Sequence, residues 1–169
     1  IYDGQPYFNA KLKYDIYKDQ LILNPPEQPE HIGINLIQDK TESFFIYGKN
    51  FVKITKNKTE IPDFTTGYYE LIKIGNNFNL YIKHYKDILK EIKEEGIFYS
   101  FNEKYQYYIE YQGKYYETNN KTSIVKIFPK NKKEINAFYQ KNRSISKTDY
   151  NLFINSLMTT IYHSINNSK

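Results

Sequence analysis

Residues 105–118 read Tyr-Gln-Tyr-Tyr-Ile-Glu-Tyr-Gln-Gly-Lys-Tyr-Tyr-Glu-Thr. They end where the spacing of apolar residues changes from one typical of strands to one typical of helices. Two β-prone segments flank Gln112 and Gly113, a dipeptide suited to a tight turn, which predicts a β-hairpin. After Asn119 and Asn120, apolar residues recur every three or four positions, as on one face of a helix. We therefore expect an α+β fold, with an antiparallel, hairpin-rich region in the first two-thirds of the chain and helices after it.

Two more hairpins are predicted upstream of residue 105. The first has strands at 43–47 and 51–55 around a turn at 48–50. The second has strands at 67–74 and 78–84 around a turn at 75–77. Shorter strands are expected at 7–12, 13–17, 20–23 and 32–37. Residues 24–29 contain three prolines and should form a surface loop, because proline lacks an amide donor for a strand ladder. The charged segment 87–95 fits either a short helix or a strand.

Three helices are predicted downstream, over residues 122–128, 131–142 and 146–165. The second begins with the capping-box pattern of Asn131 and Glu134, and the third repeats that pattern with Ser146 and Asp149. The third helix carries an apolar stripe formed by Tyr150, Phe153, Ile154, Leu157, Met158, Ile161 and Ile165. We expect this stripe to pack on the sheet, with docking on a partner as the alternative. The chain should then be a single domain, 1–169, whose helical part (119–169) packs on its β-rich part (1–118).

Charge is distributed unevenly along the chain. Residues 1–118 contain 15 Lys and 17 acidic residues, a net charge of −2, whereas residues 119–169 contain eight Lys, one Arg and two acidic residues, a net charge of +7. A basic region favours contact with nucleic acid, an anionic membrane surface or an acidic protein. The alternative is that the charge belongs to a helical surface that contacts only solvent. The excess of 23 Lys over a single Arg, with 19 Tyr and 11 Phe, indicates an A/T-rich genome and weakens Lys and Tyr as functional signals.

Little in the sequence points to catalysis. The absence of cysteine excludes disulfide frameworks, zinc fingers and thiol nucleophiles. The histidines, His31, His84 and His163, show none of the short spacings of metal-binding motifs, and the Gly-x-Ser-x-Gly pattern of hydrolases does not occur. We therefore expect a protein that is not an enzyme and that needs no metal and no cofactor. A small hydrolase that uses Asp15 and Asp19 as a carboxylate pair is the alternative.

The sequence also predicts how the protein relates to a membrane. No apolar run approaches the roughly 18–20 residues that a membrane-spanning helix needs, so no transmembrane segment is expected. The chain begins with Ile1 and not with Met, which fits either removal of a leader peptide or a start inside a longer chain.

Tyrosine side chains mark the third hairpin as a candidate contact surface. Its first strand places Tyr on both faces, so one face can join the core while the other meets a partner. Tyrosine is favoured in protein interfaces and in sugar-binding sites. The residues that we predict to bind a partner are Tyr107, Tyr108, Tyr111, Tyr115, Lys132 and Lys133. Nucleic acid is an unlikely partner, because direct base recognition relies on Arg.

The opening segment resembles small exported envelope proteins and N-terminal modules of Bacteroidota. The resemblance rests on Tyr2-Asp3-Gly4, Tyr7, Asn9, Leu12, Tyr14-Asp15, Asp19 and Leu21-Ile22. It continues through residues 67–71, 81–86 and 131–135, and so spans most of the chain. It implies a protein exported to the periplasm, peripheral to the outer membrane and without catalytic residues. One such protein is the plug subunit that closes the type IX secretion translocon.

We therefore expect a non-catalytic periplasmic accessory protein that binds an outer-membrane protein or complex, with plugging or gating of the type IX translocon as its specific role. The alternative is a glycan- or nucleic-acid-binding module that uses the Tyr faces and the basic C-terminal helices.

Overall fold

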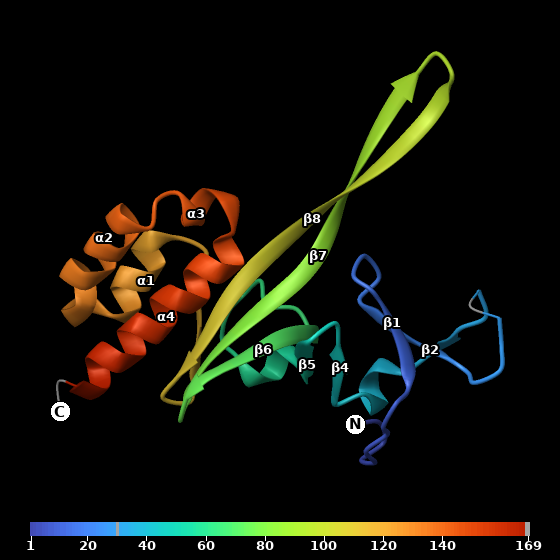
Figure 1. Cartoon of the computed structure of the whole chain (residues 1–169), viewed down its shortest axis with the longest axis horizontal. Coiled ribbons are helices and arrows are strands. Elements are labelled where there is room, and N and C mark those ends of the chain that lie inside the picture. Colours follow the sequence, from blue (N-terminus) through green and yellow to red (C-terminus); the bar gives the residue numbers. More distant parts are fainter. Residues whose placement is uncertain (30, 168–169) are drawn as a thin grey trace. The chain divides into compact units, whose positions relative to one another are not determined.

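A computed structural model describes residues 1–29 and 31–167 and shows an α+β fold (Figure 1). The strands are β1 (Lys11–Asp15), β2 (Gln20–Asn24), β3 (Ile34–Asn35), β4 (Ser43–Ile46), β5 (Lys49–Ile54), β6 (Gly67–Gly75), β7 (Phe78–Lys93), β8 (Gly96–Tyr111) and β9 (Lys114–Glu117). The helices are α1 (Lys121–Ile127), α2 (Lys132–Lys141), α3 (Ile145–Thr148) and α4 (Tyr150–Asn167). The predicted fold class is thus confirmed.

The strands form two sheets in which each strand lies beside its neighbour in sequence. Strands β1, β2 and β3 make a three-stranded antiparallel sheet, and β4 to β9 make a six-stranded sheet in chain order. Such connections can be tight turns. At the last of them, Gln112 and Gly113 have φ of 52° and 76°, as a type I′ turn requires at both central positions. The register pairs Tyr111 with Lys114, so the predicted turn is confirmed.

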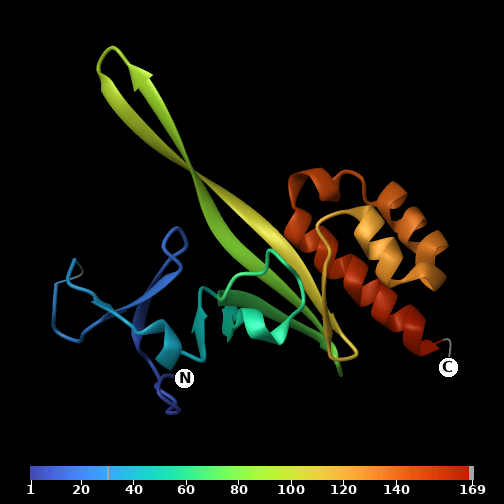
Figure 2. The ribbon, with the colours of Figure 1, turned by 180° about the vertical axis from the view of Figure 1, so that it is seen from behind.

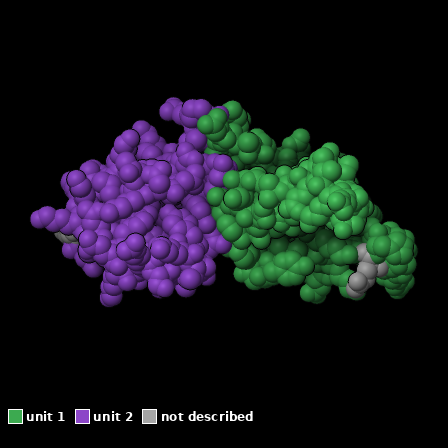
Figure 3. Space-filling view, turned by 90° about the horizontal axis from the view of Figure 1, so that it is seen from above, with its two compact units in different colours: residues 1–58, 63–71, 82–105 green, residues 59–62, 72–81, 106–169 purple. Residues whose placement is uncertain are grey.

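The described chain divides into two compact units, which Figure 3 colours separately. Unit 1 comprises residues 1–58, 63–71 and 82–105, and unit 2 comprises residues 59–62, 72–81 and 106–169. The division crosses β6, β7 and β8 and does not fall at residue 118, the boundary that the change of period suggests. A single domain over 1–169 stays a prediction.

Unit 1 has an aromatic core. Its buried cluster consists of Leu21, Phe44, Ile46, Phe51 and Tyr68, with Leu12, Tyr14 and Leu36 packed against it. The Tyr14 ring lies edge-on to Phe44 at 5.3 Å and to Phe51 at 5.2 Å between ring centroids. Edge-to-face packing is favourable for aromatic rings, so β1 is held against β4 and β5.

The core of unit 2 is built on α4. Five residues of the predicted stripe are buried, namely Phe153, Ile154, Leu157, Met158 and Ile161. Asn151 accepts a hydrogen bond of 2.8 Å from the Tyr107 hydroxyl of β8, and the ring of Tyr162 lies 5.5 Å from that of Phe78 on β7. These contacts show that α4 packs on the strands of unit 2, as expected.

Several strand boundaries differ from the predictions. The two strands expected at 7–12 and 13–17 are a single strand, β1, and the strand expected at 32–37 is reduced to the two residues of β3. The turn between β4 and β5 consists of Tyr47 and Gly48, both with positive φ, and not of residues 48–50. Residues 87–93 extend β7, so the strand reading of this segment is right and the helix reading is wrong.

Two helix starts also differ in detail. The Asn131 side chain makes no bond to the backbone of α2; it donates to Glu134 Oε2 at 3.1 Å and to Ser164 Oγ at 2.9 Å. At α4 the amide of Leu152 donates to Asp149 Oδ1 at 2.9 Å, so Asp149 is the cap and residues 145–148 form the separate helix α3. Asn131 is therefore the residue before α2, as predicted, but without the predicted capping bond, and the predicted cap of α4 at Ser146 is wrong.

Candidate partner-binding site

Strands β7 and β8 continue beyond the strands that flank them in the sheet (Figures 1 and 2). Strand β6 has 9 residues and turns directly into β7, so it can accompany only the first nine residues of β7, as far as Lys86. On the other side, β9 pairs with residues 108–111 of β8. Residues 87–104, here called the arm, are therefore a ribbon of two strands with no third strand beside it in the described chain.

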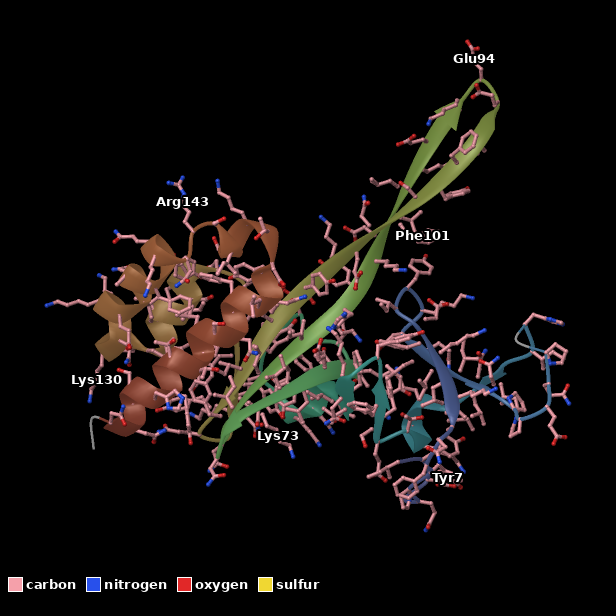
Figure 4. The ribbon with its side chains drawn as sticks, viewed as in Figure 1. Tyr7, Lys73, Glu94, Phe101, Lys130 and Arg143 are labelled. Carbon is pink, nitrogen blue, oxygen red and sulfur yellow. The ribbon has the colours of Figure 1, made fainter. Side chains whose placement is uncertain are left out.

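The arm is exposed along its whole length, from residue 87 to residue 104. It nevertheless carries seven large apolar side chains in contact with water: Ile88, Leu89, Ile92, Ile97, Phe98, Tyr99 and Phe101. A two-stranded ribbon alone is marginally stable in water, and exposed apolar patches mark interaction sites. Figure 4 labels Glu94 at the tip of the arm and Phe101 nearer its root.

Most of these apolar side chains share one face of the ribbon. The rings of His84 on β7 and Tyr105 on β8 lie 5.1 Å apart, which places both residues on the same face. Side chains alternate between faces along a strand, so counting in steps of two from these anchors gives the members of that face. Within the arm its large apolar members are Ile88, Ile92, Ile97, Tyr99 and Phe101, here called the apolar face, and Lys90 and Glu103 lie on the same side.

The opposite face of the arm is more polar. The Lys93 ammonium lies 5.4 Å from the centroid of the Phe98 ring and 3.1 Å from the Glu91 carboxylate, which confirms that these three side chains share a face. Alternation adds Leu89 to the same face, so it holds two large apolar side chains where the apolar face holds five. The arm is thus amphipathic in the manner of a half-buried strand pair.

The apolar face leads down to a cluster of charged side chains at the root of the arm. The Phe101 ring contacts the Tyr17 ring of the β1–β2 turn at 5.6 Å. Below it, a cavity of about 280 Å³ is lined in part by Lys49, His84, Glu103 and Tyr105. Within this cluster His84 is buried, and its two ring nitrogens face two carboxylates.

Both nitrogens of His84 are occupied. Nε2 lies 2.7 Å from Glu70 Oε2, and Nδ1 lies 3.5 Å from Glu103 Oε1. Lys49 Nζ donates to the same Glu70 oxygen at 2.8 Å. A general base needs a free ring nitrogen within reach of the proton that it removes. Because neither nitrogen is free, we interpret the cluster as an anchor for the arm.

Burial alone would raise the pKa of Glu70, but hydrogen bonds from His84 and Lys49, together with their charges, lower it below the usual value of 4.5. Because the carboxylate form is favoured in the folded protein, Glu70 contributes to the free energy of unfolding. This contribution is complete above about pH 4.5 and is lost as the pH falls through the lower pKa of the folded state. Acidification below pH 4.5 should therefore reduce the free energy of unfolding of the wild type more than that of Glu70→Gln. Urea titrations at pH 7 and pH 3.5 test this; equal losses in both proteins would contradict it.

The carboxylates considered for a hydrolase have structural partners. Asp15 Oδ1 accepts hydrogen bonds from the amides of Tyr17 and Lys18 at 3.0 and 3.2 Å, which is a turn motif. Asp19 Oδ1 accepts from the Tyr14 hydroxyl at 2.5 Å, and its Oδ2 accepts from Lys83 Nζ at 2.6 Å. Burial lowers the pKa of Lys83, and the Asp19 carboxylate opposes this shift. The geometry therefore gives no support to acid–base chemistry by this pair.

The tyrosines predicted to bind a partner lie largely in the core of unit 2. Tyr107 and Tyr108 are buried, and since they are neighbours on one strand, both faces of β8 are covered there. Tyr111 is half-buried, with its ring 5.2 Å from that of Phe128. Tyr115 is half-buried beside Tyr81, at 5.6 Å. Burial removes the first two rings from the protein surface.

The predicted lysines differ from the tyrosines in their exposure. Lys132 and Lys133 are exposed in the first turn of α2. Other exposed cations of unit 2 include Lys130 and Arg143 (Figure 4). Partner binding by the lysines and by the half-buried Tyr111 and Tyr115 stays a prediction.

The arm itself was not among the predicted binding residues, although the sequence contains a signal for it. Residues 97–101 read Ile-Phe-Tyr-Ser-Phe, a run of high β propensity that follows the Glu94-Glu95-Gly96 turn. Read together with the charged segment before it, this run indicates a hairpin, and its exposure would then indicate a contact surface.

A second concave feature lies in unit 1 near the N-terminus. This groove has a volume of about 730 Å³ and is lined mainly by apolar side chains, among them Leu12, Leu23 and Phe44. Exposed Tyr7, labelled in Figure 4, is among the residues that line it. Among the residues that line it there is no Asp, Glu, His, Lys or Arg, so it offers no charged side chain for chemistry.

A comparison of the chain with protein-family models, curated proteins and solved structures finds no match. Over residues 1–29 and 31–167, the chain contains no group of three or more His, Cys, Asp or Glu side chains that could hold a metal ion. Within the same residues, no helix combines the length and the apolar character needed to cross a membrane.

Proposed function

We propose that this protein is a non-catalytic binding protein that engages another protein through the apolar face of its arm. The observation that carries the proposal is the placement of Ile88, Ile92, Ile97, Tyr99 and Phe101 on one exposed face of an unsupported ribbon. Water is a poor environment for such a face, and covering it with a partner removes apolar surface from water at roughly 25 cal/mol per Å².

The composition of the arm favours a protein over a glycan or a nucleic acid. Three of the five residues on the apolar face are isoleucines, which provide neither a flat ring nor a polar group for sugars or bases. The arm contains three Lys and five acidic residues, a net charge of −2, which repels phosphate groups. Burial of Tyr107 and Tyr108 also removes two of the rings on which the glycan and nucleic-acid alternative depended.

The cellular setting of the proposal comes from the sequence resemblance to exported envelope proteins of Bacteroidota. On that basis the partner is an outer-membrane protein or complex, the protein is a periplasmic accessory subunit, and the most specific version is a plug of the type IX secretion translocon. A two-stranded ribbon with an exposed apolar face suits such a role because it offers a partner an uncovered contact surface.

Affinity capture of the tagged protein from its native cells tests the proposal. The Ile92→Ser/Tyr99→Ser variant alters the apolar face, and Leu89→Ser/Phe98→Ser alters two exposed apolar residues on the opposite face. Interface side chains near the centre of a contact cost more than about 1 kcal/mol each when truncated. We therefore expect the first variant to recover its envelope partner at least roughly 10-fold less than the wild type.

The second variant should recover the partner within roughly threefold of the wild type, because its substitutions leave the apolar face intact. Circular dichroism spectra check that both variants remain folded. Equal losses in the two variants would contradict a role for the apolar face. Recovery of the wild-type protein alone would overturn the proposed function as a whole.

A further inference from the structure

The arm leaves an open backbone edge on β8 that differs from the edge on β7. Residues 97–102 of β8 read Ile-Phe-Tyr-Ser-Phe-Asn and carry no charge and no proline. The facing segment of β7, residues 87–93, contains Asp87, Lys90, Glu91 and Lys93. Natural proteins protect open edges with charged residues, above all lysine. The β7 edge has this protection, whereas the β8 edge has the composition of a segment that pairs with another strand.

The backbone groups of alternate β8 residues are directed toward this open edge. At Tyr107 the carbonyl oxygen accepts from the Thr118 amide at 2.8 Å, and the amide donates to Asn119 Oδ1 at 2.7 Å. Both bonds lie on the β9 side of the strand, since β8 stands between β7 and β9. Strand backbone groups alternate in direction, so those of Ile97, Tyr99 and Phe101 point to the same side. The register with β9 covers residues 108–111, and the bonds at Tyr107 extend it by one residue, so it does not reach residues 97–102.

We propose that a second copy of this chain pairs with the β8 edge, antiparallel and centred on Tyr99. Residue 97 of one copy then lies opposite residue 101 of the other, and Tyr99 lies opposite Tyr99. The product is a four-stranded sheet in the order β7-β8-β8-β7. Because directly opposed residues share a face, this pairing joins the two apolar faces into one continuous surface.

The sequence of the edge is complementary to itself in this register. When the pairing is centred on Tyr99, the three apolar-face residues of one β8 lie opposite the same three residues of the other. They form one Tyr99–Tyr99 pair and two Ile97–Phe101 pairs, and such pairs are favourable across strands. In this register the pairing covers residues 96–102, because β8 begins at Gly96 and Glu94 and Glu95 form the turn to β7. No like charges meet over residues 97–101.

This inference does not depend on the proposed function, because a dimer can form with or without another partner. If both are right, dimerisation doubles the apolar face that is available to that partner. The arm is narrow compared with the roughly 800 Å² that each partner contributes to a standard interface. We therefore expect a weak, concentration-dependent dimer and not a permanent one.

Two measurements on the full chain test the pairing. Sedimentation of the wild type from about 5 to 500 µM should show a reversible shift from monomer to dimer, the range in which a contact of modest size associates. The chain has no cysteine, so single cysteines report the register. Opposed strand residues have Cα atoms about 4.5–5.5 Å apart, within the span of a disulfide. Tyr99→Cys should thus form a covalent dimer on mild oxidation.

Ser100→Cys is the matched control, because it alters the next residue of the same strand. In the proposed register Ser100 lies opposite Phe98, so its cysteines are displaced and should cross-link at least roughly 10-fold more slowly than those at position 99. A wild-type protein that stays monomeric at the highest concentration would overturn the proposal. Equal cross-linking at positions 99 and 100 would overturn it as well, even if the protein dimerises.

Discussion

Replacing Asp19 with Asn should lower the free energy of unfolding by about 3–5 kcal/mol, the usual cost of removing one partner from a buried ion pair. The Lys83 side chain is only 9% exposed and lies 2.6 Å from Asp19. After the substitution, its ammonium must stay buried without a counter-charge or lose its proton. Asn preserves the size of the side chain and tolerates the positive φ of 53° at this position, so the loss reports the charge together with the acceptor oxygen that the amide group replaces.

Asp15→Asn provides the matched control for Asp19→Asn. Asp15 lies in the same turn, and its carboxylate accepts two backbone amides near the surface. Its replacement removes only the charge-assisted part of those bonds and should cost about 1 kcal/mol or less. Urea unfolding followed by circular dichroism measures both variants. An Asp19→Asn variant as stable as Asp15→Asn would show that the ion pair does not stabilise unit 1.

Phe153→Ala should lower the free energy of unfolding by about 3–5 kcal/mol, because truncation of a buried Phe loses its transfer free energy and leaves a cavity. Phe153 is 1% exposed. Its ring lies 5.4 Å from Phe138, 4.8 Å from Tyr139 and 5.5 Å from Tyr150. These neighbours come from α2 and from α4 itself, so the cavity would form at the contact between the two helices.

Leu152→Ala is the control for the Phe153 prediction, since it changes the preceding residue of the same helix. Leu152 is 53% exposed, and an exposed substitution usually changes stability by no more than about 0.5 kcal/mol. Thermal or urea unfolding measures the difference between the two variants. A loss of similar size in both would mean that the stripe of α4 is not the core of unit 2.

Local signals were sufficient for most of the fold. The turn at Gln112 and Gly113 is predictable because Gly accepts positive φ without strain. The β4–β5 turn was placed too late in the sequence, because it begins at Tyr47, a residue whose Cβ disfavours positive φ. The stripe of α4 is predictable because its seven apolar members recur at helical spacing, and the structure buries five of them. In each case the signal lies within a few residues of the structure that it predicts.

The failures depend on contacts that the local sequence pattern does not contain. Asn131 was expected to cap α2, but its amide bonds Ser164, 33 residues away. The segment 87–95 fits a helical face with Ile88, Leu89 and Ile92, and only pairing with β8 makes it a strand. The Tyr pattern of β8 predicts one core face and one contact face, whereas Tyr107 and Tyr108, on opposite faces, are both buried.

The most direct test of the central claim is photo-cross-linking in living cells from two adjacent positions of the arm. A photoreactive phenylalanine analogue at Ile92 lies on the apolar face, and the same analogue at Lys93 lies on the opposite face. Both residues are exposed, so access alone does not distinguish them. If the apolar face binds a protein partner, the analogue at position 92 should join the chain to a different protein, and that at position 93 should do so at least roughly 10-fold less. Equal cross-linking from the two positions, or no cross-link from position 92, would contradict the account.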